Sequence, residues 1–537
     1  MTDAPTASGQ DFTVTVAGGT FRMANAAKTL TLSGNSNTNI QIDGALIFDT
    51  LGNISVTGVS AVFEGSGSIA KTGAGTLTFG NGGNSFSGNL DASAGKVVAS
   101  AASVGGNSAL GAKTGTRTVT IDSPAAMDWT INDVYGGTGL NAANLPEIVL
   151  NGATLKTTRY NALGRVTLAG GTLLNANATD PVNYDGFQFL GTVTATGSSP
   201  SSIATTTGRG NHLRGGATNE FAVTDAAGTL TIDTILRNGS TGYPGTALLT
   251  KTGHGTLVLT AANAYTGTTT VAAGTLVLGG SIAGPATVAP AATLGGSGTV
   301  AGAVTVQGVL APDAAATLTT GPLTFAAGAA LLAAGDVSVT GNIDLADAAL
   351  TVPVAPAAGP RVLLAFSGTR SGSFDEASSS LPAGWEIVYD DGAGEVRLEE
   401  TAEPYLTWIA GFETDGLSGF ADDADFDGID NGLEFLIGGD PTVPNDTPLP
   451  TFGKSSKGGF TYSFRRDARA RGAVAVVAQF SDDLATWPPA RDLIVGLDTA
   501  SSDPGVEISD QGDHDLVEIT IAGADPRTFV RLLAETP

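Results

Sequence analysis

The residues that could do chemistry lie close together at positions 423–434, where the sequence reads DADFDGIDNGLE. Carboxylates stand at Asp423, Asp425 and Asp427, so three acids fall within five residues. Like charges at this separation repel one another, and a hard cation held by oxygen ligands is the simplest reason to crowd them. The spacing therefore predicts a cation site here, with Ca²⁺ as the expected ion.

The other oxygen ligands follow from the order of positions in an EF-hand-type loop. Gly428 stands at position 6 of such a loop, where a sharp turn is needed. Ile429 at position 7 would offer its backbone carbonyl, and side-chain oxygens follow at positions 9 and 12. The expected calcium ligands are therefore Asp423, Asp425, Asp427, Ile429, Asn431 and Glu434.

Two features of the loop depart from a calcium sensor. Position 8 is Asp430, where an aliphatic residue is usual, and the sequence contains no second loop with which this one could pair. A single structural site of the thrombospondin-repeat or dockerin kind is expected instead, with short helices on either side at residues 405–412 and 433–437. An acidic turn that binds no ion is the alternative.

The sequence offers no candidate catalytic residue, and the acidic loop is expected only to bind a metal. His212, His254 and His514 are too far apart in the sequence to indicate a triad or a zinc site. The absence of cysteine excludes thiolate catalysis and Cys-ligated metals. We therefore expect a protein that is not an enzyme. If it were one, a polysaccharide lyase or hydrolase would fit a strand-rich scaffold, but its paired carboxylates are not found at a regular spacing.

Most of the chain that precedes the loop repeats itself. KTGAGTLTF at residues 71–79 recurs as KTGHGTLVL at residues 251–259. The motif N-x-[YF]-x-G follows each copy, at residues 84–88 and 263–267. Gly and Asn at the corners of these segments supply the positive φ angles that tight turns need.

The spacing of the repeated leucines indicates the architecture. Leu257, Leu276, Leu294 and Leu310 follow one another at steps of 19, 18 and 16 residues. Such a step is too short for a βαβ unit, which needs about 30 residues, but it suits one coil of short strands. Apolar and small polar residues alternate, so each coil has one face that only a stacked neighbour can bury. This predicts an all-β parallel solenoid, with threonines at equivalent corners stacked into hydroxyl ladders between coils; an array of β-sandwiches is the alternative.

The two copies, the second of which is followed by V-x-x-G-T-L at residues 271–276, resemble the autotransporter-associated β-strand repeat of bacterial secreted passengers. Residues 292–312 look like the late coils of such passengers, and residues 335–352 and 372–374 look like their C-terminal end. The resemblance implies a right-handed parallel β-helix and a secreted or cell-surface location. The translocator barrel of a typical autotransporter is not expected in the last 137 residues, and no signal peptide is expected at the start of this chain.

A change in charge marks the end of the repeats. Residues 401–537 hold 24 of the 51 acids and 9 of the 25 bases, a net charge of −15. We expect a solenoid at 1–400, a calcium-loop segment at 401–442 and a small β-sandwich at 443–537. The sandwich strands are predicted at residues 459–465, 473–480, 506–508, 516–521 and 528–533. The tail resembles C-terminal modules of large secreted proteins from Verrucomicrobia-like bacteria.

Charge and hydropathy limit the partners. A net charge of −26 disfavours nucleic acid, and no run of 18 apolar residues predicts a transmembrane helix. Glycans and cell-surface or matrix components remain. We expect a structural or adhesive rod-like spacer that displays its C-terminal module. The alternatives are a polysaccharide-binding or carbohydrate-active protein on a β-helix scaffold, and a passenger fragment that promotes export.

Overall fold

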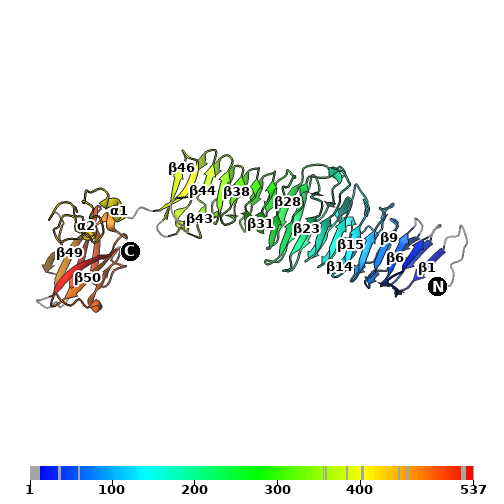
Figure 1. Ribbon diagram of the computed structural model, residues 1–537, viewed down its shortest axis with the longest axis horizontal. Helices are drawn as coiled ribbons and strands as arrows, with labels where there is room; N and C mark the ends of the chain where they lie inside the picture. Colours follow the sequence, from blue (N-terminus) through cyan, green and yellow to red (C-terminus); the bar gives the residue numbers. More distant parts are fainter. Residues whose placement is uncertain are drawn as a thin grey trace. The chain divides into compact units, whose positions relative to one another are not determined.

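A computed structural model describes residues 12–33, 38–57, 61–354, 356, 360–382, 385–400, 404–445, 448–454, 459–521 and 528–535. The chain divides into two compact units, Met1–Glu399 and Glu400–Pro537. The first consists of long parallel sheets and the second of short antiparallel sheets with two helices (Figure 1). The predicted fold class, a parallel β-helix followed by a β-sandwich, is confirmed.

Two long parallel sheets run through the β-helix, and most coils give one strand to each (Figure 1). The sixteen-stranded sheet contains β2 (Gly19–Met23), β5 (Leu46–Thr50), β8 (Ile69–Thr72), β10 (Leu90–Ala92), β14 (Thr118–Asp122), β16 (Glu147–Asn151), β19 (Val166–Ala169), β22 (Val193–Ala195), β25 (Thr218–Val223), β28 (Leu248–Thr252), β30 (Thr269–Val271), β33 (Ala286–Val288), β36 (Val304–Val306), β39 (Leu323–Phe325), β42 (Ile343–Asp344) and β45 (Arg370–Ser371). The fifteen-stranded sheet contains β3 (Thr29–Ser33), β6 (Asn53–Thr57), β9 (Thr76–Gly80), β11 (Lys96–Ala99), β15 (Ala126–Trp129), β17 (Thr154–Thr157), β20 (Thr172–Asn175), β23 (Ser201–Thr205), β26 (Thr229–Ile232), β29 (Thr256–Leu259), β31 (Gly274–Leu278), β34 (Ala292–Gly296), β37 (Val309–Pro312), β40 (Ala330–Leu332) and β43 (Ala349–Thr351).

Shorter sheets complete the coils. They contain β1 (Phe12–Val16), β4 (Thr38–Ile42) and β7 (Ala61–Glu64), then β18 (Asn161–Leu163), β21 (Phe187–Phe189), β24 (Asn211–His212) and β27 (Leu236–Arg237). The last of them contains β32 (Ser281–Ile282), β35 (Thr299–Val300), β38 (Thr317–Thr320), β41 (Asp336–Val339), β44 (Arg361–Phe366), β47 (Glu395–Glu400) and β46 (Trp385–Asp390). A small hairpin, β12 (Asn107–Ser108) and β13 (Gly111–Ala112), and the 3₁₀ turns η1 (Ala142–Asn144), η2 (Val182–Tyr184) and η3 (Glu376–Ser378) lie between strands.

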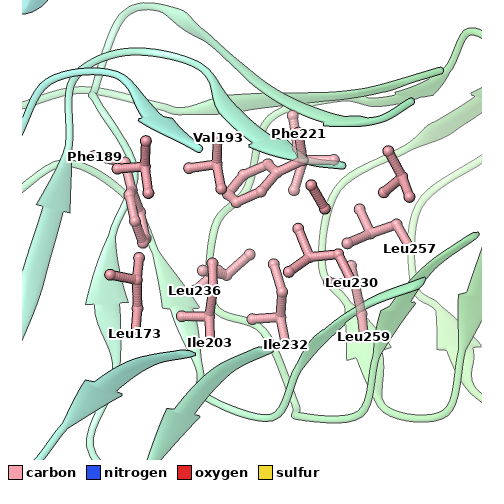
Figure 2. Close-up of a cluster of buried hydrophobic side chains, with 14 of the residues drawn as sticks. Leu173, Phe189, Val193, Ile203, Phe221, Leu230, Ile232, Leu236, Leu257 and Leu259 are labelled. Carbon is pink, nitrogen blue, oxygen red and sulfur yellow. The ribbon is translucent and has the colours of Figure 1, made fainter. Parts of the chain in front are cut away.

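The repeated leucines form one column of the core. Leu257 pairs in register with Leu276, Leu276 with Leu294 and Leu294 with Leu310, and all four side chains are fully buried. Figure 2 shows how such side chains from successive coils fill the interior. Each buried leucine contributes about 1.5–3 kcal/mol to folding through loss of apolar surface from water. The predicted stacking of repeats therefore encloses a continuous hydrophobic core.

The face of the sixteen-stranded sheet that points away from the core carries a row of threonines. Thr250, Thr270, Thr287, Thr305 and Thr324 are consecutive register partners on five strands, and all of them are partly or fully exposed. A second row lies on the fifteen-stranded sheet and contains Thr229, Thr256, Thr275 and Thr293. Stacked threonines stabilise neighbouring strands through contacts between their side chains. The expectation that such ladders lie at the corners is wrong for these two rows: they lie on the sheet faces, where residues in register on adjacent strands are direct neighbours.

The asparagine of N-x-[YF]-x-G lies in the corner between a strand of one long sheet and the next strand of the other, and its side chain binds backbone groups there. The amide oxygen of Asn84 accepts a hydrogen bond from Phe63 N at 2.9 Å, while its nitrogen donates to Ala109 O at 2.7 Å. Asn263 accepts in the same way from Leu236 N at 2.9 Å. The following aromatic residue of each copy is fully buried. The motif therefore fastens a corner to the coils next to it.

The last coil ends in an antiparallel pair of strands. β44 is followed in its sheet by antiparallel β47, and β46 lies at the edge. Tyr389 of β46 packs against the core and accepts a hydrogen bond from Phe374 N at 2.9 Å. Reversal of strand direction ends the series of parallel strands that another coil could join.

The second unit has one hydrophobic core, to which helices and sheets both contribute. The helices are α1 (Pro404–Ile409) and α2 (Asn431–Ile437). One sheet has the order β48 (Thr451–Lys454), β49 (Phe460–Asp467), β53 (His514–Ile521) and β52 (Val506–Asp510), and the other β51 (Leu493–Val495), β50 (Ala475–Ser481) and β54 (Phe529–Glu535), with η4 (Ala468–Ala470) and η5 (Pro489–Arg491) between strands. The five predicted strands and both helices are confirmed within a few residues; β48 and β51 were not predicted, because both are short and β48 is exposed throughout.

A buried ion pair joins two strands of the sandwich. Asp515 accepts hydrogen bonds from Arg466 Nε and Nη2 at 2.9 and 2.7 Å, and the two side chains are only 4% and 3% exposed. Arg466 also donates to the carbonyls of Gly496 and Leu497. The guanidinium thus connects β49, β53 and the chain that follows β51.

Substitution Asp515→Ala should destabilise the second unit by about 3–5 kcal/mol, because it leaves the Arg466 charge buried and uncompensated. Urea unfolding of the full chain, followed by tryptophan fluorescence, measures the change. Asp482→Ala is the control, since Asp482 pairs with Arg491 on the surface and should cost no more than about 1 kcal/mol. Equal effects of the two substitutions would contradict the role given to the buried pair.

Candidate metal site

The three aspartates of the acidic loop converge. Asp423, Asp425 and Asp427 each offer a carboxylate oxygen, and these three oxygens lie within 4.8 Å of one another. The loop follows α1 and leads directly into α2, which begins at Asn431. Because both helices pack in the core of the second unit, the ends of the loop are held by that core.

Backbone N–H groups orient the carboxylates. Asp423 Oδ2 accepts from Gly428 N at 2.9 Å, and Asp425 Oδ1 accepts from Asp427 N at 3.1 Å. Gly428 has φ of +90°, which a side chain would make strained, so glycine permits this turn. The second oxygens, Asp423 Oδ1 and Asp425 Oδ2, are shielded from solvent and have no hydrogen-bond donor. Two oxygens are thus left for an ion.

Asp427 completes the group from a different direction. Its Oδ1 accepts from Ile429 N at 2.9 Å, and its Oδ2 accepts from Asn445 N at 2.8 Å. Asn445 lies beyond α2, so the hydrogen bond closes the loop against the segment that leads to the sandwich. No feature of the sequence near Asn445 indicated this contact.

The electrostatics of the loop favour a cation. Desolvation raises the pKa of Asp425, and the charges of Asp427 and Asp423 raise it further. Desolvation also raises the pKa of Asp430, with a smaller effect from Asp423. Each shift records first the cost of keeping a charged carboxylate away from water and then the repulsion of its neighbours, and a divalent cation between the carboxylates would offset both.

The remaining predicted ligands have different surroundings. Asn431 is fully buried, and its amide oxygen accepts from Ala424 N at 3.2 Å. Its amide nitrogen donates to Leu417 O at 2.9 Å and to Gly419 O at 3.1 Å. In this structure Asn431 therefore fastens the loop through backbone groups. Glu434 is fully buried in the first turn of α2, and Ile429 directs its N–H to Asp427.

The unusual residue at position 8 has a structural reason. Asp430 is the N-cap residue of α2, and its carbonyl accepts from Leu433 N and Glu434 N at 2.9 and 3.0 Å. The side chain makes no capping hydrogen bond, so the observed contacts are those of the backbone. The position differs from an EF-hand-type loop because the helix begins one residue later, at Asn431.

The structure does not bring the three histidines together. His254 is exposed at a corner of the β-helix, and His514 contacts Asp513 in the second unit. His212 is buried, with its ring nitrogens 2.9 and 3.1 Å from the carbonyl oxygens of Asn238 and Val182. Desolvation lowers the pKa of His212. Its surroundings are those of a residue that holds loops together.

Calcium titration of the full chain should show one weak site, with a dissociation constant of about 10⁻⁴–10⁻³ M as in extracellular modules. Asp425→Asn should weaken binding by at least about tenfold, because it removes one charged ligand. Isothermal titration calorimetry measures both constants. Glu413→Gln is the control, an exposed acid before the loop. Absence of binding at millimolar Ca²⁺, or equal affinity of Asp425→Asn and the parent, would exclude the site.

Comparison with known proteins identifies part of the β-helix. Residues 69–99 and 249–278 match the family model of the passenger-associated-transport-repeat. No curated protein and no solved structure matches the chain. Within the parts of the chain described above, no helix has the length and hydropathy to cross a membrane.

The matched segments are structurally equivalent. Residues 69–99 contain β8 to β11, and residues 249–278 contain most of β28 and all of β29 to β31. Both copies of the repeated motif, KTGAGTLTF at residues 71–79 and KTGHGTLVL at residues 251–259, lie inside them. Passenger repeats of this kind imply an extracellular or surface location. The first unit is therefore a parallel β-helix in which two segments match the passenger-associated-transport-repeat.

Proposed function

We propose that the protein is a secreted or cell-surface structural and adhesive protein, in which the β-helix is a rod-like spacer that displays the C-terminal unit. The observation that carries the proposal is the row of partly exposed and exposed threonines from Thr250 to Thr324. A face of short, uncharged side chains in register suits a spacer, whereas an enzyme needs acids and aromatic residues around a cleft.

Charged residues on the faces bind across coils. Asp128 lies 2.9 Å from the ammonium of Lys96 and 3.3 Å from that of Lys156, on the strands before and after its own. Glu147 accepts a hydrogen bond from Thr167 on the next strand at 2.7 Å. These contacts hold coils together and support a structural role for the faces.

The acidic loop fits a structural calcium site in the displayed unit. Its carboxylates connect through Asn445 to the chain that follows α2, and Asn431 fastens the start of α2 to residues near α1. A bound Ca²⁺ would join these segments and stabilise the unit by mass action. Glycans and matrix components are the partners that an acidic, calcium-stabilised module suits best in this proposal.

Carbohydrate chemistry on the β-helix is the second candidate. Asp91 on β10 and Asp122 on β14 lie on neighbouring strands. Desolvation raises the pKa of Asp91, the charge of Asp122 raises it further, and a hydrogen bond from Thr120 lowers it. A carboxyl group with a raised pKa beside a second carboxylate is the arrangement of glycosidases. Asp122, however, accepts a hydrogen bond from Asn151 at 2.7 Å, which favours a structural role.

A glycan array probed with the full chain, with Ca²⁺ and with a chelator, tests the proposal. We expect the glycan binding of the parent chain to be lost when the chelator is added, and we expect the Asp425→Asn variant not to bind, because adhesion is assigned to the C-terminal unit. Asp91→Asn should leave the array pattern unchanged. Release of sugar from a polysaccharide, or binding that Asp91→Asn abolishes, would favour the carbohydrate-active alternative.

A further inference from the structure

Two lysines occupy positions in the hydrophobic interior. Lys71 pairs in register with Phe48 on one side and Ala92 on the other, and both neighbours are buried. Lys251 lies in the same way between Phe221 and Val271. Both lysine side chains are fully buried. Each is the first residue of the repeated motif in one of the two transport repeats.

The ammonium group of each lysine binds three backbone carbonyls. Lys71 Nζ donates to the oxygens of Thr72, Gly73 and Ala94 at 2.9, 2.6 and 3.0 Å. Two of these carbonyls belong to the corner that follows the lysine, and the third belongs to the next coil. An ammonium has three N–H donors, so all of them are satisfied.

The second repeat reproduces this geometry. Lys251 Nζ donates to the oxygens of Thr252, Gly253 and Ala273 at 2.8, 2.8 and 3.0 Å. Desolvation lowers the pKa of each lysine to about 8, so both remain mainly charged at neutral pH. Two segments about 180 residues apart have thus formed the same buried cation cage.

Glycines allow the backbone to close around the ammonium. Gly73 has φ of +75° and Gly95 has φ of +68°. A Cβ atom on Gly95 would lie 2.8 Å from Lys71 Nζ and 2.3 Å from Gly75 O. Gly253 and Gly274 have the corresponding φ angles of +75° and +64°. The motif therefore encodes both the cation and the turn that presents carbonyls to it.

No other side chain meets the same requirements. Methionine would fill the space of the lysine stem but leave three carbonyls without a donor. Arginine is charged, but its planar group presents donors in a fixed fork that does not match three carbonyls around a point. Lysine alone supplies a compact charge on a flexible stem.

We propose that Lys71 and Lys251 are corner clamps, each of which joins its transport repeat to the following coil, and that each of these coils folds only when its own lysine amine is free. Folding of the coil therefore requires a free lysine amine at this position. An acylated lysine keeps one N–H, loses its charge and gains volume, so it cannot enter the cage. Once the coil has formed, the amine is inaccessible.

Acetylation before and after folding tests the proposal. Acetic anhydride transfers an acetyl group to a free amine: a C–N bond forms, the anhydride C–O bond breaks, and acetate and a proton are released. Applied to the native full chain, the reagent should modify the exposed Lys28 and the half-exposed Lys96 at least about 100-fold faster than Lys71 and Lys251. In urea the four rates should be equal. Peptide mass spectrometry measures them.

The sample acetylated while native is next unfolded in urea, and both samples are then refolded by removal of urea. We expect the sample that was acetylated while native to regain its β-sheet circular dichroism and protease resistance, and the sample acetylated in urea to regain neither in the β-helix. Equal recovery of both samples would overturn the proposal. So would native labelling of Lys71 or Lys251 at the rate of Lys96.

Substitutions separate the clamp from general effects of acetylation. Lys251→Met should lower the urea midpoint of the β-helix, and Lys251→Arg should not restore it, whereas Lys28→Met, at an exposed lysine, should change the midpoint little. If Lys251→Met behaved like Lys28→Met, the lysine stem would only fill space and the clamp would be excluded. If Lys251→Met failed to fold, the labelling rates of the unmodified chain would still decide the question.

Discussion

Each coil of the β-helix depends on its neighbours, because a flat ring of about 20 residues cannot remove its inward side chains from water. Leu257, Leu276 and Leu294 are buried only because they lie one above another in register. The same stacking requires each strand to be parallel to the next and each corner to return to the same place. The glycines, the buried asparagines and the two buried lysines all serve that requirement.

The sequence was sufficient to predict this architecture where the chain repeats itself. The leucine steps and the period-two alternation led directly to the core columns. Lys71 and Lys251 are exceptions to what residue type alone predicts. Lys251 stands two residues after the buried Leu249, so the alternation places it inside, whereas a lysine is ordinarily exposed. The four-stranded sheet of β18, β21, β24 and β27 lies in a region without the motif, and nothing in its sequence predicted it.

At the acidic loop, spacing predicted the group of aspartates and missed the detail. Asp423, Asp425 and Asp427 converge because alternate residues of a tight turn face its inside. The role of Asn431 depended instead on where α2 begins and on which backbone groups lie nearby. Such contacts come from segments distant in the sequence, as the hydrogen bond from Asn445 to Asp427 also shows.

The direction of the backbone hydrogen bonds has a mechanical consequence. In the long parallel sheets these bonds run from coil to coil, along the axis of the stack. Tension along that axis therefore loads the junctions between coils in series, and the weakest junction yields first. The corners that Lys71 and Lys251 fasten to the next coil add buried, charge-assisted bonds to two of these junctions. Under load, the stack would part between coils elsewhere before it parted at the transport repeats.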